Sequence, residues 1–329
     1  MGIYLTQVTT TCRVFSMEDY PRDLLELEAR FSTEAACEEY LFRLRWSEGF
    51  GCDHCGGRKA WPVSSARKNR WECAACHGQV ALTAGTIFQD SHLPLTLWFR
   101  AAWWVTSQKN GVSAMGLQRV LGLKSYKTAW TMLHKLRRAM VRPGRDRLSG
   151  HVEADEAFVG GEEEGVHGRQ TETKAMIAVA VEEAGRGIGR IRMRRVPDAS
   201  AESLMPFLED SVEPGSVVRT DGWLGYMPLK GNGYKHEIVF LKNSNRTASE
   251  LMPRVHLAVA LLKRWLLGTH QGGVSLEHLD AYLDEFTFRF NRRKSRSRGK
   301  LFYRLLEQAV AVQPVPYKSL VKCSVDPDF

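Results

Sequence analysis

Apolar residues recur at helical spacing near the start of the chain. Residues 33–46 and residues 95–109 both place apolar side chains three or four positions apart, which puts them on one face of a helix. Between these two helices the period disappears. From residue 49 to about residue 83 the chain is rich in glycine, cysteine and short polar turns, which indicates a small unit held together by a metal ion rather than by a large core.

A second pair of helices is predicted in residues 111–140. The apolar pattern on each side of Gly122 predicts a helix, a turn and a second helix, which is the layout of a helix-turn-helix DNA-binding unit. An ordinary helical hairpin would produce the same pattern, because the pattern contains no chemistry of its own. The second helix is basic, and the residues that we expect to contact DNA are Lys127, Arg137 and Arg138.

After residue 150 the period changes from helical to strand-like. Pro143 and Gly144 end the helical part, so a domain boundary is expected near 145–150. Three early strands, a helix, a further strand and then helices predict an α/β or α+β domain with a mixed sheet. The strand-like runs are HVEADEAFVGG, TKAMIAVAVEE, GRIRMRRV and GSVVRTDG, and the helical stretches are AESLMPFLED, RVHLAVALLKRWLLG and LEHLDAYLDEFTFRFN.

The net charge of +9 is unevenly distributed along the 329 residues. Residues 1–50 carry 5 basic and 9 acidic side chains, residues 51–150 carry 16 and 4, and residues 151–329 carry 25 and 24. A local excess of positive charge is what neutralisation of DNA phosphates requires, although a basic surface without a partner would look the same. No apolar stretch reaches the roughly 20 residues of a membrane helix, so we expect a cytoplasmic protein, associated with the nucleoid when bound to DNA, with no membrane partner.

Four of the seven cysteines form two tight pairs. Cys52 and Cys55 are separated by two residues, as are Cys73 and Cys76, and 17 residues lie between the pairs. This spacing is typical of a zinc ribbon, in which each pair directs two thiolates at one point and a single structural Zn²⁺ completes the tetrahedron. Ribbons of this kind bind DNA, RNA or protein, so the motif predicts the metal more firmly than the partner.

Two aspartates end strand-like runs in the second half of the chain. Asp155 lies in VEADEAFVGG and Asp221 follows SVVRT. If the two strands are neighbours, their carboxylates meet at one edge of the sheet and offer the hard oxygen ligands that Mg²⁺ or Mn²⁺ prefers. Most aspartates in such places merely end a strand, so this pair needs a third residue to become a candidate catalytic site.

His256 is the candidate for that third residue. It lies in the first turn of a predicted helix whose first residue is Pro253, and Lys263 follows seven residues later, which is nearly two helical turns. A neutral metal ligand or proton acceptor and a phosphate-binding cation would then line one groove. A histidine with a purely structural role would satisfy the same pattern.

Several long motifs of this chain resemble one known family. The run FRLRWSEGFGCDHCGG, the segment ALTAGTIFQDSHLPLTLWFRAAWW, the blocks VEADEAFVGG and RTDGWLGY, and the segment KRWLLGTHQGGVSLEHLDAYLDEFTFRFNRR are similar to the insertion-sequence transposases of the ISXO-like group, insertion-sequence family fifteen-ninety-five. The resemblance covers nearly the whole chain. It implies a zinc ribbon followed by a ribonuclease-H-like, DDE-type integrase-like domain.

The resemblance also implies an acidic catalytic triad. Asp155 and Asp221 match its first two positions, and His256 stands where many relatives have Glu, followed by Lys263 as in some branches of the family. Because imidazole suits Mg²⁺ less well than a carboxylate does, Glu250 is a reserve candidate for the third ligand. Glu153 and Glu156 flank Asp155 and are candidates for a supporting carboxylate, Glu153 on the same face of the strand.

The expected protein is a multidomain DNA transposase. It would bind the terminal inverted repeats of its element, cleave DNA and transfer the strand to target DNA with Mg²⁺ or Mn²⁺, working as a homo-oligomer because two ends must be paired. Arg292, Arg293 and Lys294, within the basic segment 291–300, would hold flanking or target DNA, unless this segment is only a solvated tail. The expected parts are an N-terminal helical segment (1–48), a zinc ribbon (49–84), a helix-turn-helix domain (85–147), a ribonuclease-H-like catalytic domain (148–300) and a C-terminal helix and tail (301–329).

Two other functions share these motifs. A non-catalytic zinc-ribbon regulator with a decayed nuclease fold would also carry His256 in place of a carboxylate. A site-specific nuclease without strand transfer would use every residue named above. Inverted repeats in the DNA that flanks the coding sequence would favour the mobile element.

Overall fold

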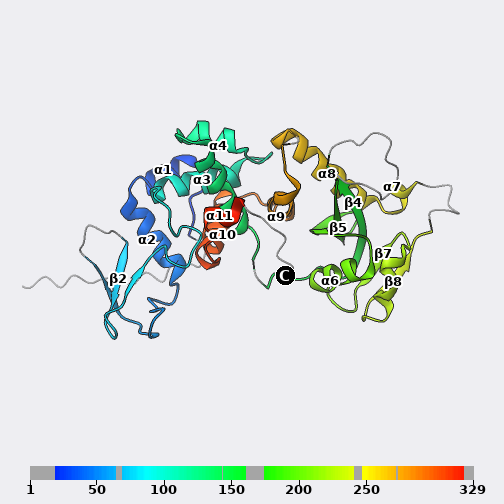
Figure 1. The fold of residues 1–329 in the computed structure, drawn as a ribbon, viewed down its shortest axis with the longest axis horizontal. Helices are drawn as coiled ribbons and strands as arrows, with labels where there is room; N and C mark the ends of the chain where they lie inside the picture. The colour runs from blue at the N-terminus through cyan, green and yellow to red at the C-terminus, as the bar shows by residue number, and fades with distance from the viewer. Residues whose placement is uncertain are drawn as a thin grey trace, which may run out of the picture.

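The N-terminal part of the chain is helical apart from one small sheet. A computed structural model describes residues 19–63, 69–142, 144–160, 174–240, 247–271 and 273–321 (Figure 1). The sheet has the antiparallel order β1-β2-β3 and lies between the second and third helices of the chain. The elements of this part are α1 (Leu24–Arg30), α2 (Glu34–Arg45), β1 (Ala60–Pro62), β2 (Arg70–Cys73), β3 (Gln79–Ala81), α3 (Leu95–Ser107), α4 (Ala114–Leu121) and α5 (Tyr126–Arg138).

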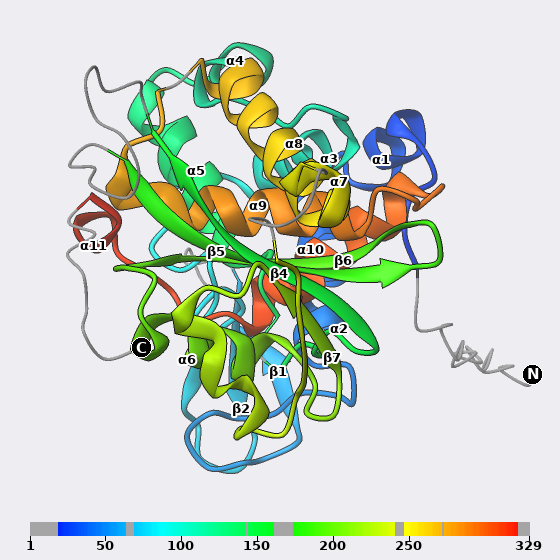
Figure 2. The same ribbon diagram turned by 90° about the vertical axis from the view of Figure 1, so that its right-hand side faces the viewer.

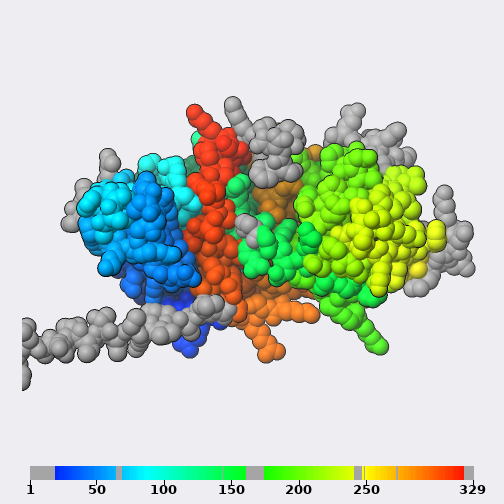
Figure 3. Space-filling view, turned by 90° about the horizontal axis from the view of Figure 1, so that it is seen from below, coloured from blue at the N-terminus to red at the C-terminus, as the bar shows by residue number. Residues whose placement is uncertain are grey.

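A helix from the far end of the chain completes this helical half. Helix α10 (Arg298–Ala311) packs on α2 and α3, and Phe302 is fully buried among their aromatic side chains. The helix begins so close to the backbone of Pro21 that a Cβ on Gly299 would overlap the Pro21 carbonyl, which requires glycine there. Figure 3 shows this segment, in orange and red, between the two halves of the molecule.

The second half is built on a mixed sheet of five strands. The strand order is β6-β5-β4-β7-β8, in which β4, β5 and β6 pair antiparallel while β7 and β8 run parallel to β4. This order places β4, which contains Asp155, beside β7, which ends directly before Asp221. The strands are β4 (His151–Val159), β5 (Ala175–Ala184), β6 (Gly187–Val196), β7 (Val217–Thr220) and β8 (Lys235–Ile238).

Helices cover both faces of this sheet (Figure 2). Alternate residues of β4 point to opposite sides, so Val152 and Ala154 pack toward α6, while Val159 packs toward α8. Two faces covered by helices and this mixed strand order are consistent with a ribonuclease-H-like domain. The helical elements of this half are α6 (Ala201–Ser211), η1 (Leu224–Lys230), α7 (Ala248–Leu251), α8 (Pro253–His270), η2 (Leu276–His278) and α9 (Leu279–Asn291). The last helix, α11 (Tyr317–Val321), packs against α5.

The structure confirms the predicted order of a ribbon-like sheet, helices, and a mixed sheet with helices. Strand β8 and helix α1 are elements that the apolar pattern did not indicate. Helix α9 has apolar side chains in both halves, because Phe288 lies in the helical core and Leu283 in the core under α8. In the part of the chain that the structure describes, no helix combines the length and hydrophobicity that crossing a membrane requires.

Candidate active site and zinc centre

The four paired cysteines converge on one point. The Sγ atoms of Cys52 and Cys76 are 3.7 Å apart, those of Cys55 and Cys73 are 3.6 Å apart, and all four lie within 4.8 Å of one another. A tetrahedral zinc ion with Zn–S bonds of about 2.3 Å needs sulfur atoms about 3.8 Å apart. The four-cysteine cluster therefore fits a structural zinc ion without rearrangement.

Two equivalent turns create this geometry. The N–H of Cys52 donates to Gly57 O at 3.0 Å, and in the second turn the N–H of Cys73 donates to Gly78 O at the same distance. A Cβ on Gly57 would lie 2.8 Å from the Cys73 sulfur, so a side chain would displace a ligand. Backbone N–H groups of Cys76 and Ala75 donate to the Cys73 thiol and lower its pKa to about 6, which favours the thiolate form that a metal binds.

We expect Cys73→Ser to lose the zinc ion. The hydroxyl of serine is a poor ligand at this position, so metal analysis of the purified variant should find well under one zinc per chain, and the ribbon should unfold locally while the five-stranded half stays folded. Cys37→Ser is the matched control, because Cys37 is a buried cysteine that lies outside the cluster. A Cys73→Ser protein with the zinc content of the unsubstituted chain would contradict the assignment.

Asp155 lies on β4, and Asp221 directly follows the neighbouring parallel strand β7. The recorded pairs of β4 and β7 end with Glu153 opposite Arg219, and the same offset continued by two residues brings Asp155 opposite Asp221, just beyond the end of β7. Side chains in register on adjacent parallel strands point to the same face. The two carboxylates are thus held at the edge where β7 ends and β4 continues.

The hydroxyl of Tyr226 is influenced by several carboxylates near this edge. Its hydroxyl donates to the Glu156 carboxylate at 2.9 Å, on the opposite face of β4 from Asp155. Burial first, and then the charges of Glu156, Asp155 and Asp221, raise the pKa of Tyr226 well above its usual value. The carboxylates of Glu156, Asp155 and Asp221 therefore all lie close enough to Tyr226 to act on its hydroxyl.

His256 reaches this edge from helix α8. Its Nε2 atom lies 3.9 Å from Asp155 Oδ2, and the imidazole is about one-third exposed. Helix α8 begins at Pro253, as the sequence predicts, and His256 therefore sits in the first turn. Asp155 and His256 are brought together by the packing of α8 on β4 and β5.

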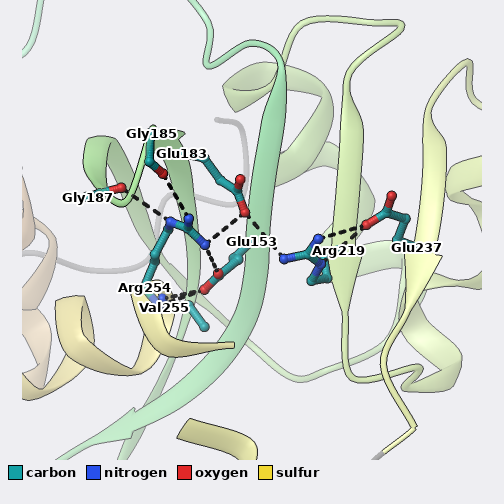
Figure 4. Close-up of polar contacts among 8 residues, drawn as sticks. All are labelled: Glu153, Glu183, Gly185, Gly187, Arg219, Glu237, Arg254 and Val255. Carbon is teal, nitrogen blue, oxygen red and sulfur yellow. Dashed lines mark hydrogen bonds and ion pairs between the residues drawn. The ribbon is translucent and has the colours of Figure 1, made fainter. Parts of the chain in front are cut away.

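A buried glutamate fixes the start of α8 on the sheet (Figure 4). No side chain of its own segment caps this helix. Instead Glu153 Oε2 accepts from the backbone N–H groups of Arg254 at 2.8 Å and Val255 at 2.9 Å, and Glu153 is fully buried. Because Glu153 precedes Asp155 by two residues on the same face of β4, the strand carries both the cap of α8 and the first candidate ligand.

The Arg254 side chain completes this anchor. Its guanidinium contacts Glu153 and Glu183, each at 2.9 Å, and donates to the carbonyls of Gly185 and Gly187 in the turn between β5 and β6. Figure 4 shows the chain of ion pairs continuing from Glu183 through Arg219 to Glu237, across β7 and β8. Arg254 and Glu183 were not candidates from the sequence, because only the fold brings these residues together. We refer to Glu153 and Arg254 below as the α8 clamp.

The candidate triad is more open than a metal-bound site. Among the described residues, the four cysteines form the only group of three or more potential ligands whose donor atoms all lie within 4.8 Å of one another. One ion with oxygen and nitrogen ligands at about 2.1 Å needs donor atoms within about 4.2 Å. Asp155, Asp221 and His256 have the chemical donor set for such an ion, but their donor atoms do not all lie within 4.8 Å of one another.

Glu250, the reserve candidate, makes contacts of another kind. It is exposed on α7, and its carboxylate accepts from the N–H of Thr247 at 2.6 Å and from the Thr247 hydroxyl at 3.1 Å. This arrangement caps the short helix α7. His256, by comparison, lies 3.9 Å from Asp155.

The structure corrects the assignment of Arg137 to DNA binding. Arg137 is 2% exposed, its Nε donates to Glu285 at 2.8 Å, and its guanidinium stacks over Tyr282. Burial alone would raise the pKa of Glu285, but Arg289 and Arg137 lower it to about 2, so the carboxylate is ionised. Arg137 therefore connects α5 to α9 inside the protein and cannot reach a phosphate without leaving a buried ion pair.

The other basic candidates lie nearer the surface. Lys127, Arg138, Lys263 and Lys294 are exposed, and the Lys127 ammonium lies 4.0 Å from the centre of the Tyr317 ring. Arg292 and Arg293 stack over the rings of Phe288 and Phe290 and donate to backbone carbonyls at the end of α9. Their guanidinium groups therefore already stabilise the C-terminus of a helix.

Two models of transposase domains match this chain, one in each half. The model of the ISXO2-like transposase domain matches residues 147–291, and that of the transposase zinc-ribbon domain matches residues 32–79. A protein of Halobacterium salinarum, described as an uncharacterised protein in transposable element ISH50, is 27% identical over 274 residues, which cover 79% of this chain and 91% of the relative. The chain therefore belongs to the ISXO2-like transposases that combine a zinc-ribbon domain with a DDE transposase domain.

Proposed function

We propose that this protein binds the ends of its insertion sequence and catalyses DNA cleavage and strand transfer at Asp155, Asp221 and His256. The observation that carries the proposal is the parallel pairing of β4, which contains Asp155, with β7, which Asp221 directly follows, together with His256 at 3.9 Å from Asp155. Divalent ions bound there would activate water and stabilise the departing 3′ oxygen of a phosphodiester. Asp155 and Asp221 would supply the negative charge, and His256 would act as a neutral ligand or proton acceptor.

The helical half is proposed to hold the element ends. Helices α4 and α5 meet at Gly122, whose left-handed conformation ends α4, and the residues from Lys124 to Lys127 at the start of α5 are exposed. In a helix-turn-helix unit the start of the second helix contacts bases in the major groove. Lys127 would contact DNA there, and Arg138 would contact it at the other end of α5. Lys263, Arg292, Arg293 and Lys294 would hold DNA near the catalytic site.

The proposed domain division follows the two cores. Met140 belongs to the helical core and Leu148 to the sheet core, which supports a boundary near residue 147. Helix α10 starts at Arg298 and packs with the helical half, so the proposed C-terminal segment returns to the DNA-binding side of the molecule. A homo-oligomer is proposed because two element ends must be held together for strand transfer.

Incubation of the purified protein with candidate element ends tests this function. Products formed with Mg²⁺ or Mn²⁺ are resolved on denaturing gels, and nicks at the end of the element together with joined target strands are expected. Binding of ends without any cleavage would instead favour a non-catalytic regulator, which the histidine at the third position allows. Cleavage without joined products would favour a nuclease.

DNA binding by this protein should weaken steeply with salt. The middle segment of the chain, residues 51–150, carries 16 basic and 4 acidic side chains, so most of its contacts are expected to be with phosphates. A protein that makes six or more phosphate contacts loses roughly a thousandfold in affinity between about 50 and 200 mM salt. Titration of labelled DNA by fluorescence anisotropy at several salt concentrations measures the slope, and affinity that does not change with salt would contradict binding through this segment.

A further inference from the structure

A cavity of about 410 Å³ opens beside the candidate catalytic edge. Its walls are formed by apolar and aromatic side chains, and charged groups lie among its lining residues. This volume falls in the range of about 300–1,000 Å³ that small-molecule sites occupy in proteins. The residues that line the cavity include Phe158, Met176, Pro197, Trp223, Lys174 and Asp198.

Two residues that line the cavity closely follow the candidate catalytic aspartates in sequence. Phe158 follows Asp155 on β4 by three residues, about 10 Å along a strand. Trp223 follows Asp221 by two residues, and its backbone N–H donates to Asp221 Oδ1 at 2.9 Å. A spacing of about 10 Å corresponds to roughly three nucleotide steps of a DNA strand. Because Phe158 points to the opposite face of β4 from Asp155, a nucleotide near a phosphate at Asp155 would reach the cavity by passing the end of β7.

The Trp223 ring is held as a fixed wall. Its Nε1 donates to the carbonyl of Ala199 at 2.7 Å, which sets the orientation of the indole, and 38% of the residue remains exposed. On the polar side, the Asp198 carboxylate accepts from Ser200 N at 2.9 Å and from Ser203 Oγ at 2.7 Å. An ordered flat aromatic wall with polar groups near it matches a planar ligand that has an apolar face and hydrogen-bonding edges.

We propose that this cavity receives one nucleobase turned out of the DNA duplex near the phosphate that the site cleaves. Bases stack on aromatic side chains in a way that tolerates sequence, because every base has a π-face. Enzymes that act on duplex DNA take a nucleotide out of the stack when chemistry or access requires it. The proposal rests on the proposed function, since it needs DNA at Asp155 and Asp221, and it adds a binding site on the opposite face of β4.

The test uses duplexes that carry the terminal repeat read from the DNA flanking the coding sequence. Trp223→Ala should slow cleavage about tenfold, since a base that stacks on an aromatic side chain loses this support. An abasic site at the extruded position should restore the rate of this variant, because no base then needs a wall. Leu224→Ala is the matched control: Leu224 is 74% exposed, follows Trp223 and does not line the cavity, so the rate should stay unchanged.

A second measurement does not depend on cleavage or on the folding of the Trp223→Ala variant. In the Asp155→Asn protein, which should bind but not cut, 2-aminopurine placed at single positions around the cleaved phosphate should change its fluorescence strongly at one position only. Trp223→Phe should keep most of the cleavage rate, because phenylalanine retains a flat ring.

The outcomes distinguish failure of the proposed nucleobase site from failure of the proposed catalytic function. Normal cleavage by Trp223→Ala, or a uniform 2-aminopurine response along the duplex, would overturn the nucleobase site while leaving the catalytic proposal intact. A protein that neither binds nor cuts its element ends would overturn both. Rescue by an abasic site at a single position, with Leu224→Ala unaffected, would establish the cavity as the base-binding site.

Discussion

Asp155→Asn is expected to lower DNA cleavage by about a thousandfold while binding of the element ends persists. A bound divalent ion contributes several kcal/mol to the transition state, and about 1.4 kcal/mol corresponds to a factor of ten in rate. Replacing the carboxylate by an amide removes one negative charge from the ligands of that ion. Asp221→Asn should have a similar effect, because continuing the β4–β7 register by two residues brings Asp221 opposite Asp155.

Substitutions of His256 separate a catalytic role from a structural one. If His256 occupies the position of a family carboxylate, His256→Glu should keep substantial cleavage in Mg²⁺, whereas His256→Ala should be nearly inactive in both Mg²⁺ and Mn²⁺. Glu250→Gln is the matched control on the preceding helix, since Glu250 caps α7. Rates from single-turnover cleavage assays, with anisotropy to measure DNA binding, provide the comparison.

The opposite pattern would remove His256 from the site. An active His256→Ala protein together with an inactive Glu250→Gln protein would make Glu250 the third ligand. This outcome is unexpected, because His256 lies 3.9 Å from Asp155, whereas the Glu250 carboxylate accepts a hydrogen bond from Thr247.

The parts of this molecule that follow local rules were predictable from the sequence. The paired cysteines indicated the zinc ribbon because their spacing alone brings four sulfur atoms together, and Pro253 indicated the first residue of α8. The two strand-like runs are both strands of the mixed sheet, and Asp221 directly follows β7 as predicted, but Asp155 lies within β4 rather than at its end. That these two strands are neighbours was a hypothesis from the sequence, and the strand order shows that they are.

Features that depend on contacts between residues far apart in the sequence could not be predicted from local patterns. Arg137 has the position of a DNA-binding residue on a basic helix, but its partner Glu285 lies 148 residues away and the pattern around Arg137 does not reveal that it is buried. Arg254 meets Glu153 across 101 residues. Strand β8 is short and mostly polar, so no alternation of apolar residues indicated it.

The α8 clamp is expected to position His256, and Glu153→Ala should therefore impair catalysis as well as stability. Without Glu153 the backbone N–H groups of Arg254 and Val255 lose their buried acceptor, and the guanidinium of Arg254 keeps Glu183 as its ion-pair partner. Loss of one member of a buried ion pair costs about 3 kcal/mol of unfolding free energy. Loss of a residue that orients a metal ligand typically reduces activity or metal affinity about 10- to 100-fold.

The dependence of cleavage on metal concentration distinguishes positioning from general destabilisation. If the clamp sets the distance between His256 and Asp155, the Mg²⁺ concentration for half-maximal cleavage should rise about tenfold in Glu153→Ala and less in Glu153→Gln, whose amide oxygen still accepts from the helix. Glu237→Gln is the control, because Glu237 lies at the exposed outer end of the same ion-pair chain. If Glu153→Ala only lowered the melting temperature and left the Mg²⁺ dependence of the folded protein unchanged, the clamp would be structural alone.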